Sequence, residues 1–359
     1  MPINVLGMIG VAPATSTSTL HIMGGGVDAD YIARFTQAHE ASGFDAVLIG
    51  QRSTSADGFL IAQHAAYHTE RIKFLLAHRP GFVAPTQAAR RVATLDNLIG
   101  GRLWLHIITG GSDADQHRDG DFLGHDDRYR RTDEYLQVMR MAWTEEGSFD
   151  FEGEFYKVKG ARSDIRSTQQ PHVPLWFGGV SDAAIPVGAK HCDTYALFGE
   201  TLAEVHGLKQ RLDAEAARHN RTLRYNVSFR PIIAETEDAA WDKAREILKG
   251  VQAAGPSGDR RDAESGRRLT RLIESGEVHD ERLWVPLAAA AGGEGNTTAL
   301  VGTPEQVAEA IARYYDIGVS GVLIRGFDPF EDTIEFGREL IPWIRQKVAE
   351  RDAARLAPV

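Results

Sequence analysis

The residues best suited to chemistry lie in the stretch 101–135, GRLWLHIITGGSDADQHRDGDFLGHDDRYRRTDEY. It begins with an apolar run, RLWLHIIT, which predicts a strand buried on both faces and interrupted by His106. A long loop rich in Gly, Asp and His follows at 110–125, and helical spacing resumes at 126–145. Long polar loops inside compact domains are usually functional. Because α/β proteins bind ligands where a strand ends and a helix begins, we expect a ligand site here.

The acidic residues and histidines of this loop do not have the spacing of a metal site. DADQH at 113–117 and HDD at 125–127 lack a second set of histidine ligands at fixed spacing. The one cysteine, Cys192, excludes a disulfide within the chain and a cysteine-based zinc cluster. We therefore expect no metal, and a chain that works in a reducing compartment.

The elements that must position the loop follow from alternating apolar and amphipathic segments. Strands are predicted at 4–9, 46–50, 72–78, 102–109, 175–178, 194–198, 225–233 and 321–324. Helices are predicted at 29–42, 58–68, 85–98, 126–145, 182–190, 202–219, 238–251, 304–316 and 330–347. This alternation predicts an α/β fold, a closed (β/α)8 TIM barrel. An open doubly wound sheet ranks second, because no GxGxxG motif follows the first strand.

Local end signals support these ranges. Thr303 before Pro304, with Gln306 three residues on, predicts a capping box at a helix start. Ser181 predicts the start of another helix, and Gly43 predicts a left-handed helix end.

One segment, 255–296, breaks the alternation. It is rich in arginine, has glycines at both ends, and is too long and polar for a barrel turn. It follows the seventh strand on the side where barrel active sites lie, so we expect a mobile lid with glycine hinges; a solvated surface insertion is the alternative. The whole chain, 1–359, is expected to form one barrel domain that carries this lid insertion after strand 7.

Composition narrows the class of protein. The formal net charge of −10, with no strongly basic segment, argues against nucleic-acid binding. No apolar run approaches the roughly 20 residues that span a bilayer, and the first residues do not resemble a signal peptide. We expect a cytoplasmic protein with no membrane contact.

Six ordered blocks then carry a resemblance to a known family. They are RSTSADGFLIA at 52–62, FLLAHRPGFVAPTQAARRVATLDNLIGGRLWLHIITGG at 74–111, GDFLGHDDRYRRTDEY at 120–135, DFEGEFYKVKGA at 150–161, QQPHVPLWFGGVSDAA at 169–184 and ALVGTPEQVAEAI at 299–311. The chain resembles the bacterial luciferase-like, flavin-dependent monooxygenases, and among them the alkanesulfonate monooxygenases that use reduced FMN.

The resemblance implies where the cofactor binds. FMN would lie at the carboxyl-terminal mouth of the barrel, with its phosphate near the end of the fifth strand. Gly178 and Gly179 would let the backbone approach, Ser181 and the following amides would donate, and Tyr129 would reach the phosphate.

His106 and Thr109 stand where relatives place polar groups against the flavin ring. Ordinary packing roles are the alternatives: a helix cap for Ser181, and core positions for Tyr129 and His106. The general base stays open between His106 and His78.

The resemblance also implies the reaction. Reduced FMN from a separate NAD(P)H:FMN reductase and O2 would cleave the C–S bond of an organosulfonate, releasing sulfite and an aldehyde. The protein would be a homodimer or homotetramer.

Two arginines are expected to grip the sulfonate. Arg230 in NVSFRPII and Arg325 in VLIRGFD follow apolar strands towards the barrel mouth, although an ion pair with Asp328 or Glu331 is the alternative. Relatives have a cysteine in the loop that here carries Thr54 and a tryptophan where Phe198 stands, so the substrate is expected to differ from a simple alkanesulfonate. A bulky hydroxylated sulfonate such as sulfoquinovose is one example.

Other readings stay open. The enzyme could oxygenate a sulfone, an amine or a nitrogen heterocycle, or use a deazaflavin. A catalytically silent flavin-binding paralogue is the alternative outside enzymes.

Overall fold

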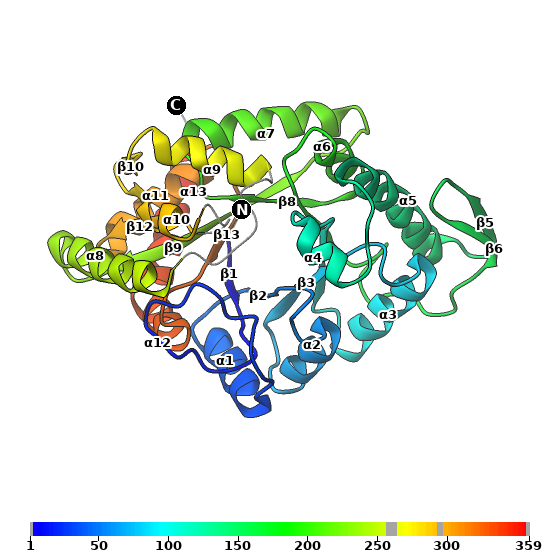
Figure 1. Ribbon diagram of the computed structural model, residues 1–359, viewed down its shortest axis with the longest axis horizontal. Helices are drawn as coiled ribbons and strands as arrows, with labels where there is room; N and C mark the ends of the chain where they lie inside the picture. The colour runs from blue at the N-terminus through cyan, green and yellow to red at the C-terminus, as the bar shows by residue number, and fades with distance from the viewer. Residues whose placement is uncertain (1–2, 256–263, 293–296, 357–359) are drawn as a thin grey trace.

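Eight parallel strands close into a barrel in the computed structural model, which describes residues 3–255, 264–292 and 297–356 (Figure 1). Neighbouring strands pair in register around the ring, and the last strand returns to the first, with Val5 opposite Val322. The strands, in ring order, are β1 (Asn4–Met8), β2 (Ala46–Ile49), β3 (Lys73–His78), β4 (Leu103–Ile108), β7 (Leu175–Gly178), β8 (Thr194–Phe198), β9 (Arg224–Ile233) and β13 (Gly321–Ile324). The predicted TIM barrel is confirmed, with a strand inside seven of the eight predicted ranges and the eighth, β9, beginning one residue before its range.

Helices surround the barrel and cover its outer face (Figure 1). They are α1 (Ala29–Ala41), α2 (Gly58–Tyr67), α3 (Pro85–Leu98), α5 (His125–Thr144), α6 (Ala184–His191), α7 (Leu202–Ala217), α8 (Glu237–Ala254), α11 (Pro304–Asp316), α12 (Pro329–Glu335) and α13 (Ile341–Leu356), with one π-helical turn between the last two. The main apolar core lies between these helices and the strands.

A second, smaller core fills the inside of the barrel. Trp104 and Trp176 stack there with their ring centroids 5.2 Å apart, and Leu6, Leu75 and Leu323 pack against them. These side chains come from neighbouring and opposite strands, and they close the amino-terminal part of the barrel. A pocket of about 50 Å³ lies on the amino-terminal side of the two tryptophans, and a wider cavity lies towards the carboxyl ends of the strands.

The predicted helix ends agree with the structure in two of three places. Thr303 and Gln306 form the predicted capping box, and Gly43 has φ +80. The third helix, α6, begins later than predicted, at Ala184. The Ser181 hydroxyl accepts the Ala184 N–H at 3.3 Å, so it caps the helix from just outside it.

Several elements lie outside the predicted ranges. A short helix, α4 (Asp113–Arg118), lies inside the polar loop, and an antiparallel hairpin, β5 (Phe149–Glu152) and β6 (Lys157–Ala161), projects beyond α5 (Figure 1). After α8 come α9 (Glu264–Glu274), β10 (Val278–His279), β11 (Leu283–Trp284), α10 (Pro286–Ala290) and β12 (Ala299–Gly302). We call residues 264–292 the insert.

The insert joins the barrel through β9. Residues 226–229 of β9 pair with β13 inside the ring, whereas Arg230 to Ile233 pair with β12, which continues to β11 and β10. Of the predicted lid, 256–263 and 293–296 lie outside the described residues. The mobility of the lid stays a prediction. Within the described ranges, no helix is both long and apolar enough to cross a bilayer.

Candidate active site

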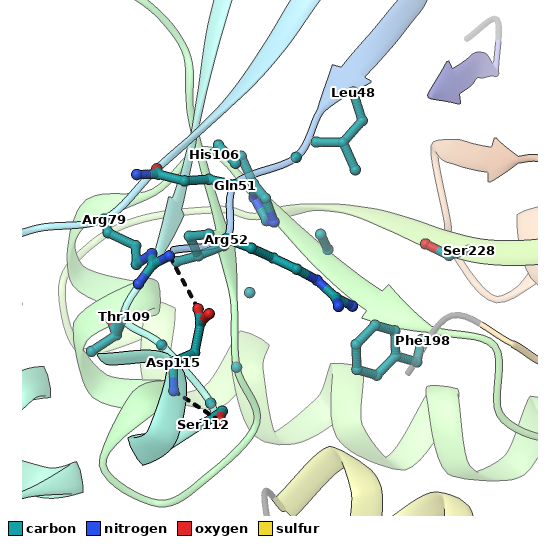
Figure 2. A pocket seen from close by; sticks show the side chains of 18 of the residues that line it. Leu48, Gln51, Arg52, Arg79, His106, Thr109, Ser112, Asp115, Phe198 and Ser228 are labelled. Atoms are coloured by element: carbon teal, nitrogen blue, oxygen red, sulfur yellow. Dashed lines mark hydrogen bonds and ion pairs between the residues drawn. The ribbon is translucent and has the colours of Figure 1, made fainter. Parts of the chain in front are cut away.

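A cavity of about 280 Å³ opens at the carboxyl ends of the strands (Figure 2). This volume is at the lower end of the ~300–1,000 Å³ typical of small-molecule sites. Each of the eight barrel strands, or the residue just after it, contributes to the lining. The apolar part of the wall consists of Met8, Leu48, Leu75, Leu197, Phe198 and Leu323. The cavity therefore lies where TIM-barrel enzymes carry out their chemistry.

The residues expected to hold a phosphate meet on one side of this cavity. Gly178, Gly179, Ser181 and Tyr129 all line it. A Cβ added at Gly179, whose φ is +130, would lie 2.7 Å from the Tyr129 hydroxyl, so only glycine leaves this approach open. Tyr129 bonds to Ser181, and burial raises the pKa of its phenol to about 12. Both hydroxyls are therefore neutral hydrogen-bond donors at pH 7.

His106 and Thr109 line the same cavity from β4. Burial lowers the pKa of His106 to about 4, so the ring is neutral at pH 7. Its Nδ1 is buried and has no hydrogen-bond partner within the described residues. The ring also lies beside Gly178, where an added Cβ would be 3.2 Å from Cε1. The Thr109 hydroxyl lies 3.2 Å from that of Thr132, so it is partly committed to α5.

Three guanidinium groups lie in the cavity wall. That of Arg79, directly after β3, pairs with Asp115 at 3.0 Å. Arg325, directly after β13, is one of the predicted residues, and its Nη1 lies 3.5 Å from the Met8 sulfur. The third belongs to Arg52, which the prediction missed. Its side chain extends into the cavity in the direction of Phe198 in the view of Figure 2, with Nη2 3.4 Å from Nδ1 of His21.

Arg230 does not line the cavity, contrary to expectation. It is 1% exposed, and its guanidinium donates to the carbonyl oxygens of Thr19, Leu20 and Gly326 at 3.0, 2.6 and 2.9 Å. It also lies 4.7 Å from the centroid of the Phe327 ring. These contacts direct the guanidinium of Arg230 towards two loops behind the cavity wall. The prediction that Arg230 contacts the substrate is therefore corrected.

His78 and Thr54 also lie outside the cavity lining. His78 is buried behind the wall, where its Nε2 lies 2.8 Å from the Tyr135 hydroxyl, and burial lowers its pKa to about 4. A general base must reach the substrate, so this placement does not favour His78 as the base. Thr54 is exposed on the loop after β2.

Further lining residues were not predicted, namely His21, Met23, Gln51, Asn226 and Ser228. Asn226 and Ser228 are buried and lie two residues apart on β9, so both face into the barrel. The polar alternation in NVSFR was the signal that could have revealed them. No local pattern marks His21 or Met23, which come from the loop after β1.

A polar network joins α4 to the cavity rim. Asp115 accepts from the Ser53 N–H and hydroxyl at 3.2 and 2.6 Å, and it pairs with Arg79 at 3.0 Å (Figure 2). Ser112 caps the same helix by accepting the Asp115 N–H. Gln116 packs so closely on Gly110 that an added Cβ there would lie 1.4 Å from its Nε2. We call residues 110–124 the α4 loop.

Two arginines of α5 hold the α4 loop from below. Arg128, which is 1% exposed, donates to the Leu123 carbonyl at 2.6 Å and to Asp113 at 2.7 Å. Arg131 pairs with Asp121 at 2.5 Å, and its partner lowers the pKa of that carboxyl below the usual value against the opposing effect of burial. These contacts fix the α4 loop, which forms one wall of the cavity.

Comparisons with known proteins agree with this geometry. Residues 1–321 match the family model described as luciferase-like monooxygenase. Among solved structures, a riboflavin lyase with modified FMN and riboflavin is 20% identical, with a TM-score of 0.78 over 97% of this chain and 92% of that one. A long-chain alkane monooxygenase is 18% identical, with a TM-score of 0.75 over 100% and 93%.

An EDTA monooxygenase from Chelativorans sp. BNC1 is 17% identical, with a TM-score of 0.75 over 100% of this chain and 95% of that one. Other structures of this fold contain FMN or an F420–acetone adduct. At these identities the structures show a shared fold, while the family model covers most of the chain. The chain belongs to the luciferase-like monooxygenase family.

Proposed function

We propose that this chain is an FMN-dependent monooxygenase that cleaves the C–S bond of an organosulfonate. The observation that carries the proposal is one cavity lined both by glycines and hydroxyls, from Gly178, Gly179, Ser181 and Tyr129, and by the guanidinium groups of Arg52 and Arg325. The first set suits a phosphate, and the second suits a small fixed anion.

The residues present fit a flavin nucleotide. Gly179 leaves a space that a Cβ would fill, beside the hydroxyls of Tyr129 and Ser181. Next to it, the neutral His106 ring has a buried Nδ1 that lacks a partner among the described residues. Gly178, Gly179, Ser181 and Tyr129 would hold the phosphate, and His106 and Thr109 would meet the ring edge. When bound in its reduced form, the flavin supplies the two electrons that activate O2.

The chain's own groups would then bind, orient and shield the substrate. Arg52 and Arg325 would hold the sulfonate oxygens, and Met8, Leu48 and Phe198 would pack on its carbon chain. One oxygen atom of O2 ends in the aldehyde and the other in water, while sulfite leaves with the electron pair of the C–S bond. The α4 loop would keep bulk water from the reacting carbon. The neutral His106 is the candidate that would accept a proton from that carbon.

The polar side chains at the floor of the cavity favour one class of substrate. Asn226 and Ser228 place a carboxamide and a hydroxyl there, among apolar side chains. Such groups favour a substrate with hydroxyls, because an alkyl chain would leave them unpaired. A hydroxylated sulfonate such as sulfoquinovose is therefore a better candidate than a simple alkanesulfonate.

Sulfite release tests the proposal. The purified chain, supplied with FMN, NAD(P)H and a separate flavin reductase, would be given a panel of sulfoquinovose and short alkanesulfonates. We expect more sulfite from the hydroxylated sulfonate than from the short alkanesulfonates, and none without O2 or without FMN. Arg325→Met and Arg52→Met should each raise KM at least tenfold, while the Kd for FMN stays within twofold.

Other outcomes separate the alternatives. Turnover of a sulfone, an amine or a heterocycle without sulfite would assign the site to another oxygenation. Turnover only with F420 would change the cofactor. FMN binding without any O2-dependent product would indicate a silent paralogue.

A further inference from the structure

We propose that Arg230 is a positioning residue that clamps together two loops of the cavity wall, so that anion binding depends on a guanidinium that never reaches the anion. The importance of this role for substrate rests on the proposed function. The clamp itself rests on contacts within the chain.

The first clamped loop follows β1. Arg230 Nη1 donates to the Thr19 carbonyl, and Nη2 donates to the Leu20 carbonyl. The next residues, His21, Ile22 and Met23, line the cavity, and His21 contacts Arg52. Fixing Thr19 and Leu20 therefore fixes the backbone from which this part of the wall projects.

The second clamped loop follows β13. Arg230 Nη1 also donates to the Gly326 carbonyl at 2.9 Å, one residue after Arg325. From the other side, one carboxylate oxygen of Asp332 accepts the Phe327 and Asp328 N–H groups at 2.6 and 2.9 Å. The peptide group between Gly326 and Phe327, one residue beyond Arg325, is thus held by a cation at its carbonyl and by an anion at its N–H.

The two loops also bond directly to each other. The Thr19 N–H donates to the Phe327 carbonyl at 2.9 Å, and the Phe327 ring lies under the guanidinium. Arg230 comes from the half of β9 that pairs with β12, so its backbone is fixed in a sheet. A buried planar fork on a rigid strand can hold several carbonyls at fixed angles, whereas the single ammonium of lysine cannot reproduce that geometry.

Hydrogen exchange on the full-length chain tests the clamp without a substrate. In Arg230→Lys we expect exchange at the Thr19, Phe327 and Asp328 amides to rise at least tenfold. Amides of β1 and β13 should stay within twofold of the parent. Arg224→Lys, an exposed arginine on the same strand, is the matched control and should change neither loop. Unchanged exchange in both loops, or faster exchange throughout the barrel, would overturn the clamp.

The parent chain gives a second test in case Arg230→Lys does not fold. A clamped Thr19 amide should exchange about as slowly as the amides of β9, and exchange as fast as that of an exposed loop would refute the role.

Kinetics then test the positioning role. With the sulfonate that the parent turns over, Arg230→Lys should raise KM at least tenfold and leave the Kd for FMN within twofold. An equal loss of both affinities would indicate a general structural defect and would contradict positioning. If the parent releases no sulfite at all, the proposed function fails, while the exchange result still decides whether the clamp exists.

Discussion

The α4 loop and the insert are both long polar segments beside the same cavity, but they are attached in different ways. The α4 loop is held by three arginines whose side chains are at most 11% exposed, each meeting an aspartate of the loop: Arg79 with Asp115, Arg128 with Asp113 and Arg131 with Asp121. Removing the aspartate of such a pair leaves a buried guanidinium without its partner.

The insert has two comparable links among the described residues. Arg268 of α9 pairs with Glu200, just after β8, and these side chains are 17% and 6% exposed. Arg282 pairs with Glu237 of α8, and these side chains are 15% and 46% exposed. Arg267 and Arg271, the neighbours of Arg268, pair with Glu264 near the surface, where ion pairs contribute little. The α4 loop is therefore the more rigidly attached wall of the cavity, and we expect any opening motion to belong to the insert.

The largest expected effect is in the α4 loop. Arg128→Met should lower the free energy of unfolding by about 2–4 kcal/mol, because a guanidinium that is 1% exposed is removed and the part-buried Leu123 carbonyl and Asp113 lose their donor. Arg130→Met, an exposed pair two residues on, should cost less than ~1 kcal/mol. Urea denaturation measures both. Equal losses would remove the distinction between buried and surface attachment.

A backbone change at the start of the same loop should cost somewhat less. Gly110 has φ +99, and an added Cβ would overlap the Gln116 side chain, so Gly110→Ala should destabilise by about 2 kcal/mol. Gly124→Ala is the control in open space, with an expected change under ~1 kcal/mol. Thermal unfolding compares the two, and a tolerated Gly110→Ala would show that the loop can yield.

The insert should respond locally. Arg268→Met should speed hydrogen exchange in α9 about tenfold, roughly 1.4 kcal/mol, with a smaller change in global unfolding, because the pair holds only this segment. Burial raises the pKa of Glu200, so its unpaired carboxyl would protonate more readily in the variant. Arg267→Met on the same helix should leave exchange unchanged. A global loss as large as that of Arg128→Met would break the comparison.

Acid should also weaken the rigid side. Burial lowers the pKa of His78 to about 4 from its ordinary 6.5, so the unfolded chain binds the extra proton. The stability from the neutral ring is complete above pH 6.5 and is lost as the pH falls towards 4, at up to ~1.4 kcal/mol per pH unit. His78→Gln should reduce the slope of unfolding free energy against pH by about one proton. An unchanged slope would count against this assignment.

The fold could be predicted from sequence because its signals are local. Each barrel strand is a short apolar run, and the Thr303 capping box lies within four residues. The same holds for the cavity residues Gly178, Gly179 and Ser181, since a strand end facing a helix start fixes their place in any such barrel.

Arg230 could not be placed in this way. A strand-end arginine can turn into the cavity or towards a neighbouring loop, and the choice depends on carbonyls of Thr19 and Leu20 that lie 211 and 210 residues away in sequence. Arg52 was missed because it follows β2 in a loop, and no periodicity in the sequence specifies the direction of that loop. The outer strand β12, which lies outside the ring of eight, also escaped prediction.

The strand β9 is ten residues long, and its two halves pair with different strands. Up to Phe229 its hydrogen bonds complete the ring, and from Arg230 onward they support a small accessory sheet. The accessory sheet can therefore be shortened, lengthened or replaced while the ring keeps all its strand pairings. The segment between α8 and β12 could be replaced by that of another barrel of this kind. Such a replacement offers a way to change the cavity entrance without changing the floor of the cavity.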